Sequence, residues 1–456
     1  MRIQRHYRRH GCAHGHKSWL KVSPPPYLEF SAPRCLRLAS FVLICLLCQS
    51  ASLAPAQETP RLSLAGPEAA RARRLADSAL PDPDLRLGPS VWSFAAQLAC
   101  QATDNLQASP DSPEPDVSFR PALITCMHLP LSELNTLKFS AETGGILYLR
   151  HPELDRPFIA PGSELALNVY LPNCWLQVHD RFAIVDNPYA DPTVTSLADY
   201  ARLQNSAGFD ATWDLNRLCA RLGYDHLFYS ALGSSSSVAD GQSDSFSASA
   251  SYSAWPGLHA GLQLDAALLR YSAAPAPSAD AGELTATTDG TQAGAGAFLN
   301  GSLSSHMDFY VGAGYTTFRP DTAAAFGAAR EFSGVYAQAV LDHRLNQILQ
   351  YAVSGGHLLN FGFFGGLLEQ SFARLDCQWL FLRQIALSTS FQFQHGTQLG
   401  FNQETFDWFG PAITASRRLT AKLTSTLGYQ FYWRTSDLPN RDYSANVLTA
   451  TLNYQF

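Results

Sequence analysis

The chain has 456 residues, of which 46% are hydrophobic and only 15% are charged. No segment after residue 56 contains the roughly 20 consecutive apolar residues that a membrane helix requires, so helical insertion of the mature chain is excluded. Without residues 1–56 the chain keeps 24 Lys and Arg against 37 Asp and Glu, a formal charge of −13. This acidic balance, without a basic stripe, argues against nucleic acid as a partner.

Residues 1–56 form a leader whose last part has the pattern of a secretory signal peptide. The apolar run 38–48 follows Arg34 and Arg37 and precedes the small residues around Ala56, which is the order of zones in such signals. We expect cleavage between Ala56 and Gln57. The alternative is a short membrane anchor, but the run is too short to span about 30 Å of hydrocarbon.

Residues 57–89 are rich in Ala, Arg and Pro, with one short helix expected within 68–80, and we interpret them as a periplasmic N-terminal segment. From residue 90 onward, clusters of Pro, Gly, Ser and Asp separate segments in which apolar and polar residues alternate. A period of two indicates strands with one apolar and one polar face. The sequence therefore predicts an all-β fold for residues 90–456, a transmembrane antiparallel up-and-down β-barrel.

About eighteen strands are expected, and an even number suits a bacterial barrel. Sixteen is the alternative, because 91–103 and 365–377 alternate weakly and Asp180 interrupts an apolar row between residues 176 and 184. The expected strands are 91–103, 116–129, 135–150, 163–171, 175–185, 209–215, 218–228, 246–252, 258–266, 290–303, 307–318, 335–341, 346–357, 365–377, 385–393, 404–414, 419–434 and 447–456.

The connections between these strands alternate between short and long. Short periplasmic turns and long external loops produce this alternation in a membrane barrel, whereas a water-soluble β-sandwich has no such rule. A Leu-Asn phrase recurs at three short turns, around Asn135, Asn216 and Asn346. Asn tolerates a positive φ angle at a tight turn, so the phrase indicates turn chemistry.

The chain ends on a strand in which Thr449, Thr451, Asn453 and Gln455 alternate with apolar residues. This segment resembles the C-terminal recognition strand of bacterial outer-membrane β-barrel proteins, which implies the barrel-assembly machinery as a partner. The alternative is a sandwich domain with a C-terminal edge strand. The apolar row that would form the assembly signal is Leu448, Ala450, Leu452, Tyr454 and Phe456.

Beyond that strand, the layout resembles a broad group of outer-membrane β-barrel porins, some of which are linked to exopolysaccharide export. The matching features are a strand that ends in Asp104-Asn105, the Leu-Asn turns and the terminal Phe456. The resemblance implies a location in the outer membrane, contact with its lipid, and periplasmic export partners for some members. Barrels of about eighteen strands enclose an aqueous path unless they are plugged.

No catalytic or cofactor motif stands out in the sequence. His179-Asp180-Arg181 is the densest polar triplet, but consecutive strand residues point to opposite faces, so His179 and Arg181 share a face that Asp180 does not. We therefore expect no enzyme activity, no cofactor and no metal. The cysteines of the mature chain are scattered and odd in number, which suggests neither disulfides nor a zinc site: Cys100, Cys126, Cys174, Cys219 and Cys377.

Charged residues in the polar rows are candidates for the lumen wall. They carry both signs, which predicts modest ion selectivity, and strand-to-strand pairs that fill the lumen are the alternative role. The candidates are Lys138, Glu142, Arg181, Arg221, Asp225, Asp265 and Lys422. Aromatic residues near strand ends fit membrane-interface girdles or ordinary strand positions, namely Trp175, Trp213, Trp255, Trp408, Trp433, Tyr271 and Phe318.

These observations predict a porin-like diffusion channel for small hydrophilic solutes. Three alternatives stay open at this point. They are an exopolysaccharide-export barrel, a hydrolase with its site at the barrel rim, and a structural or adhesion barrel whose lumen is filled with side chains.

Overall fold

The computed structural model describes residues 83–196, 201–232, 240–271, 289–321, 331–361, 367–381, 384–399 and 403–456. All of them belong to the compact unit Gln49–Phe456. The leader, the expected cleavage site between Ala56 and Gln57, and the helix expected within 68–80 lie outside the described residues. No helix in the described ranges is long and apolar enough to cross a membrane.

The described residues form two short 3-10 helices, η1 (Pro152–Leu154) and η2 (Pro188–Ala190), and twenty-one strands. The strands are β1 (Leu85–Leu87), β2 (Ser90–Thr103), β3 (Asp116–Pro130), β4 (Thr136–Tyr148), β5 (Arg156–Ile159), β6 (Ser163–Leu171), β7 (Cys174–Val185), β8 (Arg202–Leu215), β9 (Leu218–Ala231), β10 (Gly241–Trp255), β11 (Leu258–Tyr271), β12 (Gly290–Ser304), β13 (Met307–Pro320), β14 (Phe332–Arg344), β15 (Leu349–Phe361), β16 (Leu367–Phe381), β17 (Ile385–Leu399), β18 (Glu404–Phe409), β19 (Ala412–Arg418), β20 (Leu423–Ser436) and β21 (Tyr443–Gln455).

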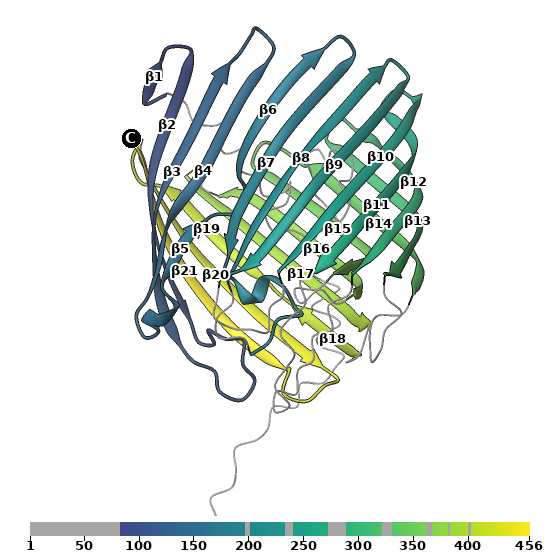
Figure 1. Ribbon diagram of the computed structural model, residues 1–456. Coiled ribbons are helices and arrows are strands. Elements are labelled where there is room, and N and C mark those ends of the chain that lie inside the picture. The colour runs from purple at the N-terminus through teal and green to yellow at the C-terminus, as the bar shows by residue number, and fades with distance from the viewer. Residues whose placement is uncertain are drawn as a thin grey trace, which may run out of the picture. The chain divides into compact units, whose positions relative to one another are not determined.

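Nineteen of these segments build the wall of a barrel, as eighteen wall strands (Figure 1). β18 and β19 are two parts of one wall strand, because both pair with β17 on one side and with β20 on the other. They are separated at Gly410-Pro411, where proline has no N–H to give to the ladder. β1 folds back and pairs antiparallel with the start of β2, and β5 pairs with the outer part of β4. The prediction of eighteen strands is therefore confirmed over sixteen.

The barrel closes between its first and last wall strands. β2 pairs antiparallel with β21, from Ala95 opposite Gln455 to Thr103 opposite Val447. Every other pair of neighbouring strands in the described sheet is also antiparallel. Closure pairs the first wall strand with the last, and this is the condition under which strands can cross a lipid bilayer.

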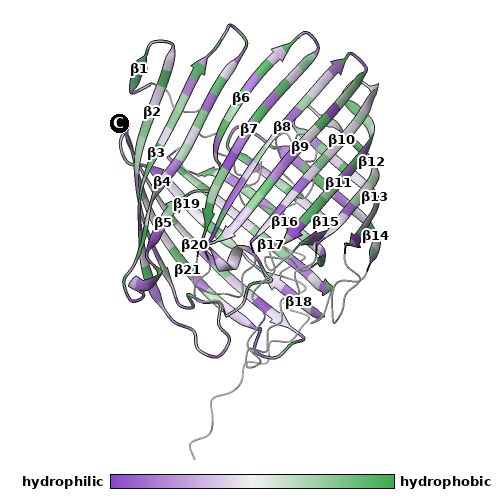
Figure 2. Cartoon of the chain, viewed as in Figure 1, coloured by the Kyte–Doolittle hydropathy of each residue, from purple (hydrophilic) through white to green (hydrophobic). Residues whose placement is uncertain are grey.

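The two faces of the wall differ in polarity, as the alternation predicts. Along one row the side chains are large, apolar and exposed, with Leu262 and Val335 each 66% exposed. Along the other row they include buried polar groups such as Glu142, Arg181 and Gln204. Figure 2 shows hydrophobic and hydrophilic residues alternating along the strands. The exposed apolar row faces outward to lipid, and the polar row faces the lumen.

Short turns lie on the side where β2 begins and β21 ends (Figure 1). They contain two to five residues, while seven of the nine connections at the opposite end are longer than the turns. The connections after β15 and β17 are exceptions with five and four residues. Of the three Leu-Asn turns, only that of Asn216 uses a positive φ angle, 65°. The side chain of Asn346 instead accepts hydrogen bonds from the amides of residues 348 and 349.

Candidate permeation site

The connection between β7 and β8 folds into the lumen. We call residues 186–196 of this connection the inward loop. Pro188 begins η2, and the Asn187 side chain accepts a hydrogen bond from the Tyr189 amide at 3.1 Å, which fixes the turn. Tyr189 and Val194 are buried, at 3% and 0% exposure. A loop with buried apolar side chains is docked against other parts of the protein and does not extend into solvent.

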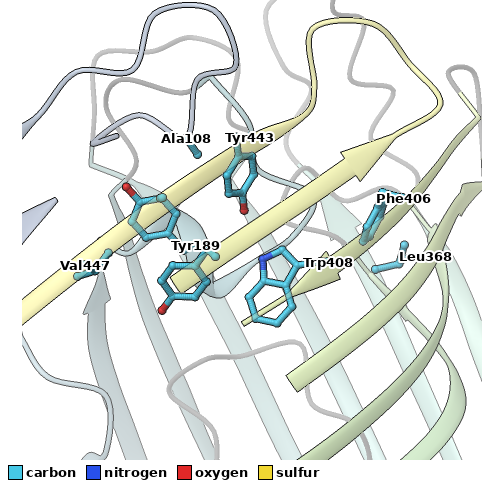
Figure 3. Packing of buried hydrophobic residues seen from close by; sticks show 9 residues of the cluster. Ala108, Tyr189, Leu368, Phe406, Trp408, Tyr443 and Val447 are labelled. Atoms are coloured by element: carbon cyan, nitrogen blue, oxygen red, sulfur yellow. The ribbon is translucent and has the colours of Figure 1, made fainter. Parts of the chain in front are cut away.

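The docking surface is a cluster of inward aromatic side chains on the C-terminal strands. The Tyr189 ring stacks on Tyr432 of β20 with centroids 4.8 Å apart and lies 6.2 Å from the Tyr443 ring of β21. Trp408 of β18 packs beside Tyr432 at 5.8 Å. Figure 3 shows Tyr189, Tyr443 and Trp408 gathered over these strands. Burial raises the pKa of Tyr189, so its hydroxyl stays neutral and bonds the backbone oxygen of Asn105.

A buried ion cluster holds the same loop from its other end. Glu404 of β18 accepts hydrogen bonds from Arg434 at 2.5 Å and from Arg441 at 3.0 Å. The two arginines also donate to backbone oxygens of the inward loop, Arg434 to Pro192 at 2.6 Å and Arg441 to Thr193 at 3.1 Å. We call these three side chains the latch, because they join the inward loop to the wall.

A second element enters the lumen from the opposite side. The ladder between β14 and β15 ends at Ala337 opposite His357, while the β15–β16 ladder continues to Phe361 opposite Leu367. We call the part of β15 and β16 beyond the β14 ladder, from Leu358 to Phe361 with the start of β16 at Leu367, the hairpin end. It packs on inward residues of other strands. The Phe361 ring meets that of Phe318 of β13 at 5.5 Å, and Leu359 and Leu367 share a buried cluster with residues of β9 and β11.

Between these two elements the wall carries a buried network of charges. Arg181 of β7 donates to Glu164 of β6 at 3.1 Å, and its guanidinium lies 3.7 Å from Asp225 of β9. His179 bonds Asp225 at 2.8 Å, and the Ser206 hydroxyl donates to the same carboxylate at 3.0 Å. Charges removed from water are stable only when paired and hydrogen-bonded, which these contacts provide.

The seven lumen candidates occupy different positions. Arg181 and Asp225 meet in this network, and Glu142 lies on the same wall, where it accepts a hydrogen bond from Gln97 at 2.8 Å. Asp265 lines a pocket further around the barrel. Lys138 on β4 and Arg221 on β9 are exposed in the polar rows near the short turns.

The position of Lys422 differs from the expected place on the lumen wall. It lies in the short turn before β20 and not on the wall, because the Thr420 hydroxyl accepts hydrogen bonds from the amides of Lys422 and Leu423, at 3.2 and 3.0 Å. That turn delays the start of the strand to Leu423, whereas the sequence pattern placed it at residue 419.

The polar triplet of β7 is split between the two faces. His179 and Arg181 point into the lumen, and the Asp180 side chain lies on the outer face, where Asn205 donates to it at 2.5 Å. The prediction of an aromatic girdle at the membrane interface was wrong for Trp408 and Phe318. Both point inward and are buried, at 3% and 0% exposure, because they share the register of lumen residues on β18 and β13.

Sequence reasoning missed the inward loop, the latch and the inserted hairpin end. One signal for the loop was present, since Asn187-Pro188-Tyr189 places an aromatic residue inside a long polar connection. A second was the pair of opposite charges, Glu404 and Arg434, at inward positions of neighbouring wall strands. In the described ranges, no group of three or more His, Cys, Asp or Glu is placed to hold a metal ion.

A closed antiparallel barrel with an apolar outer wall and a charged lumen defines a transmembrane β-barrel of the bacterial outer membrane. The exposed apolar side chains on its outer face account for that location. The long loops then face outward from the cell, and the start of β2 and the end of β21 lie on the periplasmic side with the short turns.

No protein-family model and no curated protein matches this chain. Solved structures with a similar fold include the outer membrane protein OpdK from Pseudomonas aeruginosa, 11% identical, with a TM-score of 0.43 over 80% of this chain and 99% of that one. OccK2 from the same organism, in complex with glucuronate, is 10% identical with a TM-score of 0.47 over 81% and 99%. OccAB3 from Acinetobacter baumannii is 12% identical with a TM-score of 0.44 over 80% and 99%.

Proposed function

We propose that the protein is a diffusion channel for small hydrophilic solutes. The observation that carries the proposal is the inward loop, which the latch fixes inside a lumen whose wall bears paired charges and hydroxyl groups. A loop fixed inside a wide barrel narrows the path that is open to solutes. Polar groups on the wall then replace part of the water that a solute loses there.

In this mechanism solutes diffuse through the lumen, and no covalent bond is formed or broken. Solutes would move from the external loops past the inward loop and the hairpin end of β15 and β16, and then toward the short turns. Wall groups such as Ser245, Ser247 and Gln263 supply hydrogen bonds along this route. Binding must be strong enough for entry and weak enough for release, and neutral hydroxyl and amide groups meet that condition.

Catalysis is not part of the proposal. His179, Asp225 and Ser206 resemble a catalytic triad in composition only. The Ser206 hydroxyl donates to Asp225 and not to the imidazole, so no base is aligned to activate it. Arg181 occupies the other side of the same carboxylate.

Export of polysaccharide would be favoured by lumen aromatics that can stack on sugar rings. The aromatic side chains of the loop cluster are packed on one another instead. Tyr189, Trp408, Tyr432 and Tyr443 are each 3–7% exposed, so no ring face is free for a sugar chain while the loop is docked. The diffusion channel is therefore the better-supported function.

A liposome swelling assay tests the proposal. The chain is expressed with its own leader, purified from outer membranes and reconstituted into vesicles loaded with a large polysaccharide. We expect swelling in neutral sugars at rates that fall with sugar size, because the inward loop limits the width of the path. Vesicles with folded protein that swell no faster than protein-free vesicles would refute a diffusion channel.

A further inference from the structure

The first and the last wall strand are neighbours that no connecting segment joins directly. The wall strands follow one another in chain order, and β2 meets β21 through the ladder from Ala95 opposite Gln455 to Thr103 opposite Val447. We call this joint the seam. Its ladder has nine residue pairs, against thirteen between β2 and β3 and twelve between β20 and β21. Strands without a short connection come together at a larger loss of chain entropy, so contacts from other parts of the chain matter most at the seam.

The inward loop binds the first strands next to the seam. Its first residue, Asp186, accepts a hydrogen bond from Arg120 of β3 at 2.9 Å. The Tyr189 hydroxyl lies 3.1 Å from the Thr103 hydroxyl at the end of β2 and bonds the backbone oxygen of Asn105. The loop is therefore fixed to β3, to β2 and to the connection that follows β2.

The same loop also binds the last strands. The Tyr189 ring stacks on Tyr432 of β20 and lies beside Tyr443 of β21, and Arg434 of the latch donates to Pro192. One side chain, Tyr189, thus contacts strands on both sides of the seam. When the seam opens, these contacts are lost on one side or the other.

The docked loop excludes solvent from the inner surface of the seam. Tyr443 and Val447 of β21 are 4% and 1% exposed, and Ala108 of the connection after β2 is 0% exposed. These residues and Tyr189 belong to one buried apolar cluster (Figure 3). Backbone hydrogen bonds open more rarely where packed side chains cover them, so this cover protects the external end of the seam.

β1 covers the other end of the seam. β21 ends at Phe456, whose amide donates to the Phe94 oxygen of β2 at 3.2 Å. The Asp84 carboxylate accepts a hydrogen bond from the Phe94 amide at 2.6 Å. β1 then pairs with the first residues of β2, from Leu85 opposite Trp92 onward. It therefore continues the line of β21 along an edge of β2 that could otherwise pair with another strand, and the chain end lies beside it (Figure 1).

We propose that the inward loop is a strap that holds the seam shut, so that undocking the loop loosens β2 from β21 while the other ladders of the wall stay closed. The strap covers the external end of the seam, and β1 covers the periplasmic end. This role belongs to the barrel itself and holds whatever solute passes through it, so it goes beyond the diffusion channel. It couples the width of the lumen to the closure of the wall.

Hydrogen exchange measured by mass spectrometry on the full chain in detergent tests the strap. Tyr189→Ala removes contacts on both sides of the seam, and we expect peptides covering 95–103 and 447–455 to exchange roughly fivefold faster or more. Peptides from β12 and β13, which pair only with each other and with β11 and β14, are expected to change by less than about twofold.

The matched control is another aromatic side chain of the lumen. Phe361→Ala removes a ring that packs on Phe318 of β13 at 5.5 Å, away from the seam. It is expected to leave the exchange of the seam peptides within about twofold of that in the unaltered protein.

A cross-link across the seam gives a second measurement. Cys100 of β2 lies opposite Ala450 of β21, so Ala450→Cys places two thiols where a disulfide can lock the seam. Cys377 of β16 lies opposite Thr389 of β17, and Thr389→Cys provides the same lock elsewhere in the wall. Adding Tyr189→Ala is expected to lower the temperature of the heat-dependent mobility change in full in the oxidised Thr389→Cys protein. In the oxidised Ala450→Cys protein we expect less than about half of that decrease.

Exchange of the seam peptides that is no faster in Tyr189→Ala than in Phe361→Ala would overturn the strap. An equal decrease in temperature with and without the cross-linked seam would overturn it as well. If Tyr189→Ala yields no folded barrel, Arg120→Met replaces it in both measurements with the same expected order, because it frees the loop from β3 and leaves the aromatic stack in place. Neither measurement uses conductance, so the strap and the diffusion channel are tested separately.

Discussion

Glu404 and Arg434 form an ion pair inside the barrel, with both side chains at most 1% exposed. The guanidinium also stacks on Phe406 at 4.7 Å and donates to the inward loop at Pro192. The pair therefore links the wall to the loop that narrows the lumen.

Breaking this pair is expected to release the inward loop. Arg434→Met leaves the Glu404 carboxylate buried without its main partner, a change that typically costs about 3–5 kcal/mol. We expect a lower unfolding temperature together with a larger and noisier single-channel current, measured by heat-dependent mobility on gels and in planar bilayers.

The matched control for the latch is an exposed ion pair. Arg319 and Glu331 lie 3.0 Å apart with side chains 76% and 64% exposed, so Arg319→Met should cost roughly 0–1 kcal/mol. If Arg434→Met behaves like Arg319→Met in both measurements, the latch does not hold the loop.

We expect the ring of Tyr189 to contribute more to the free energy of unfolding than its hydroxyl group does. Tyr189→Ala removes the stack on Tyr432 and should cost about 3–5 kcal/mol, as for other buried aromatic truncations. Tyr189→Phe keeps the stack and loses the hydrogen bonds of the hydroxyl to the Asn105 oxygen and to Thr103, at about 1 kcal/mol each. Unfolding midpoints of the two variants check the order, and a phenylalanine variant as unstable as the alanine variant would contradict it.

His151 in the external connection between β4 and β6 should make the stability of the protein depend on pH. Its ring bonds Asp116 at 2.8 Å and lies 3.2 Å from Glu114. The hydrogen bond to Asp116 raises the pKa of His151 above its ordinary value of 6.5. The added stability is therefore fully present below pH 6.5 and is lost as the pH rises through the raised pKa.

His151→Gln removes that contribution. We expect its unfolding midpoint to fall below that of the unaltered protein at pH 5.5 and to approach it at pH 9. A difference between the two proteins that stays constant across this range would show that His151 does not titrate against Asp116.

The terminal Phe456 is expected to act in assembly. Its amide donates to the Phe94 oxygen at 3.2 Å, and its ring, 50% exposed, lies edge-on to Tyr454. We propose that the barrel-assembly machinery recognises this ring, so Phe456→Ala should lower the amount of folded barrel in outer membranes several-fold. The control Trp255→Ala removes another exposed aromatic residue beside a short turn. Equal losses in the two variants would argue against a terminal signal.

The period-two pattern was sufficient to predict the eighteen wall strands because lipid and lumen impose it on every strand. It failed where a segment leaves that environment. The weak alternation of 365–377 has such a cause, since Leu367 and Leu368 at the start of β16 are both buried and meet protein on both faces. Asp180 interrupts an apolar row because Asn205 on the neighbouring strand bonds it.

The inward loop could not be predicted for a different reason. Its contacts join Pro192 to Arg434, residues 242 positions apart, and no local pattern encodes such a pairing. Once the barrel closes, β20 and β21 come within reach of the connection after β7, and the aromatic and charged residues on their inner faces become its partners.

Single-channel conductance tests the central claim most directly. The full chain, recovered from outer membranes and shown to be folded by its heat-dependent mobility, is added to planar bilayers with and without a salt gradient. The account predicts stable open steps that increase with salt concentration and grow in Arg434→Met. A folded protein that never conducts, in either form, would contradict it.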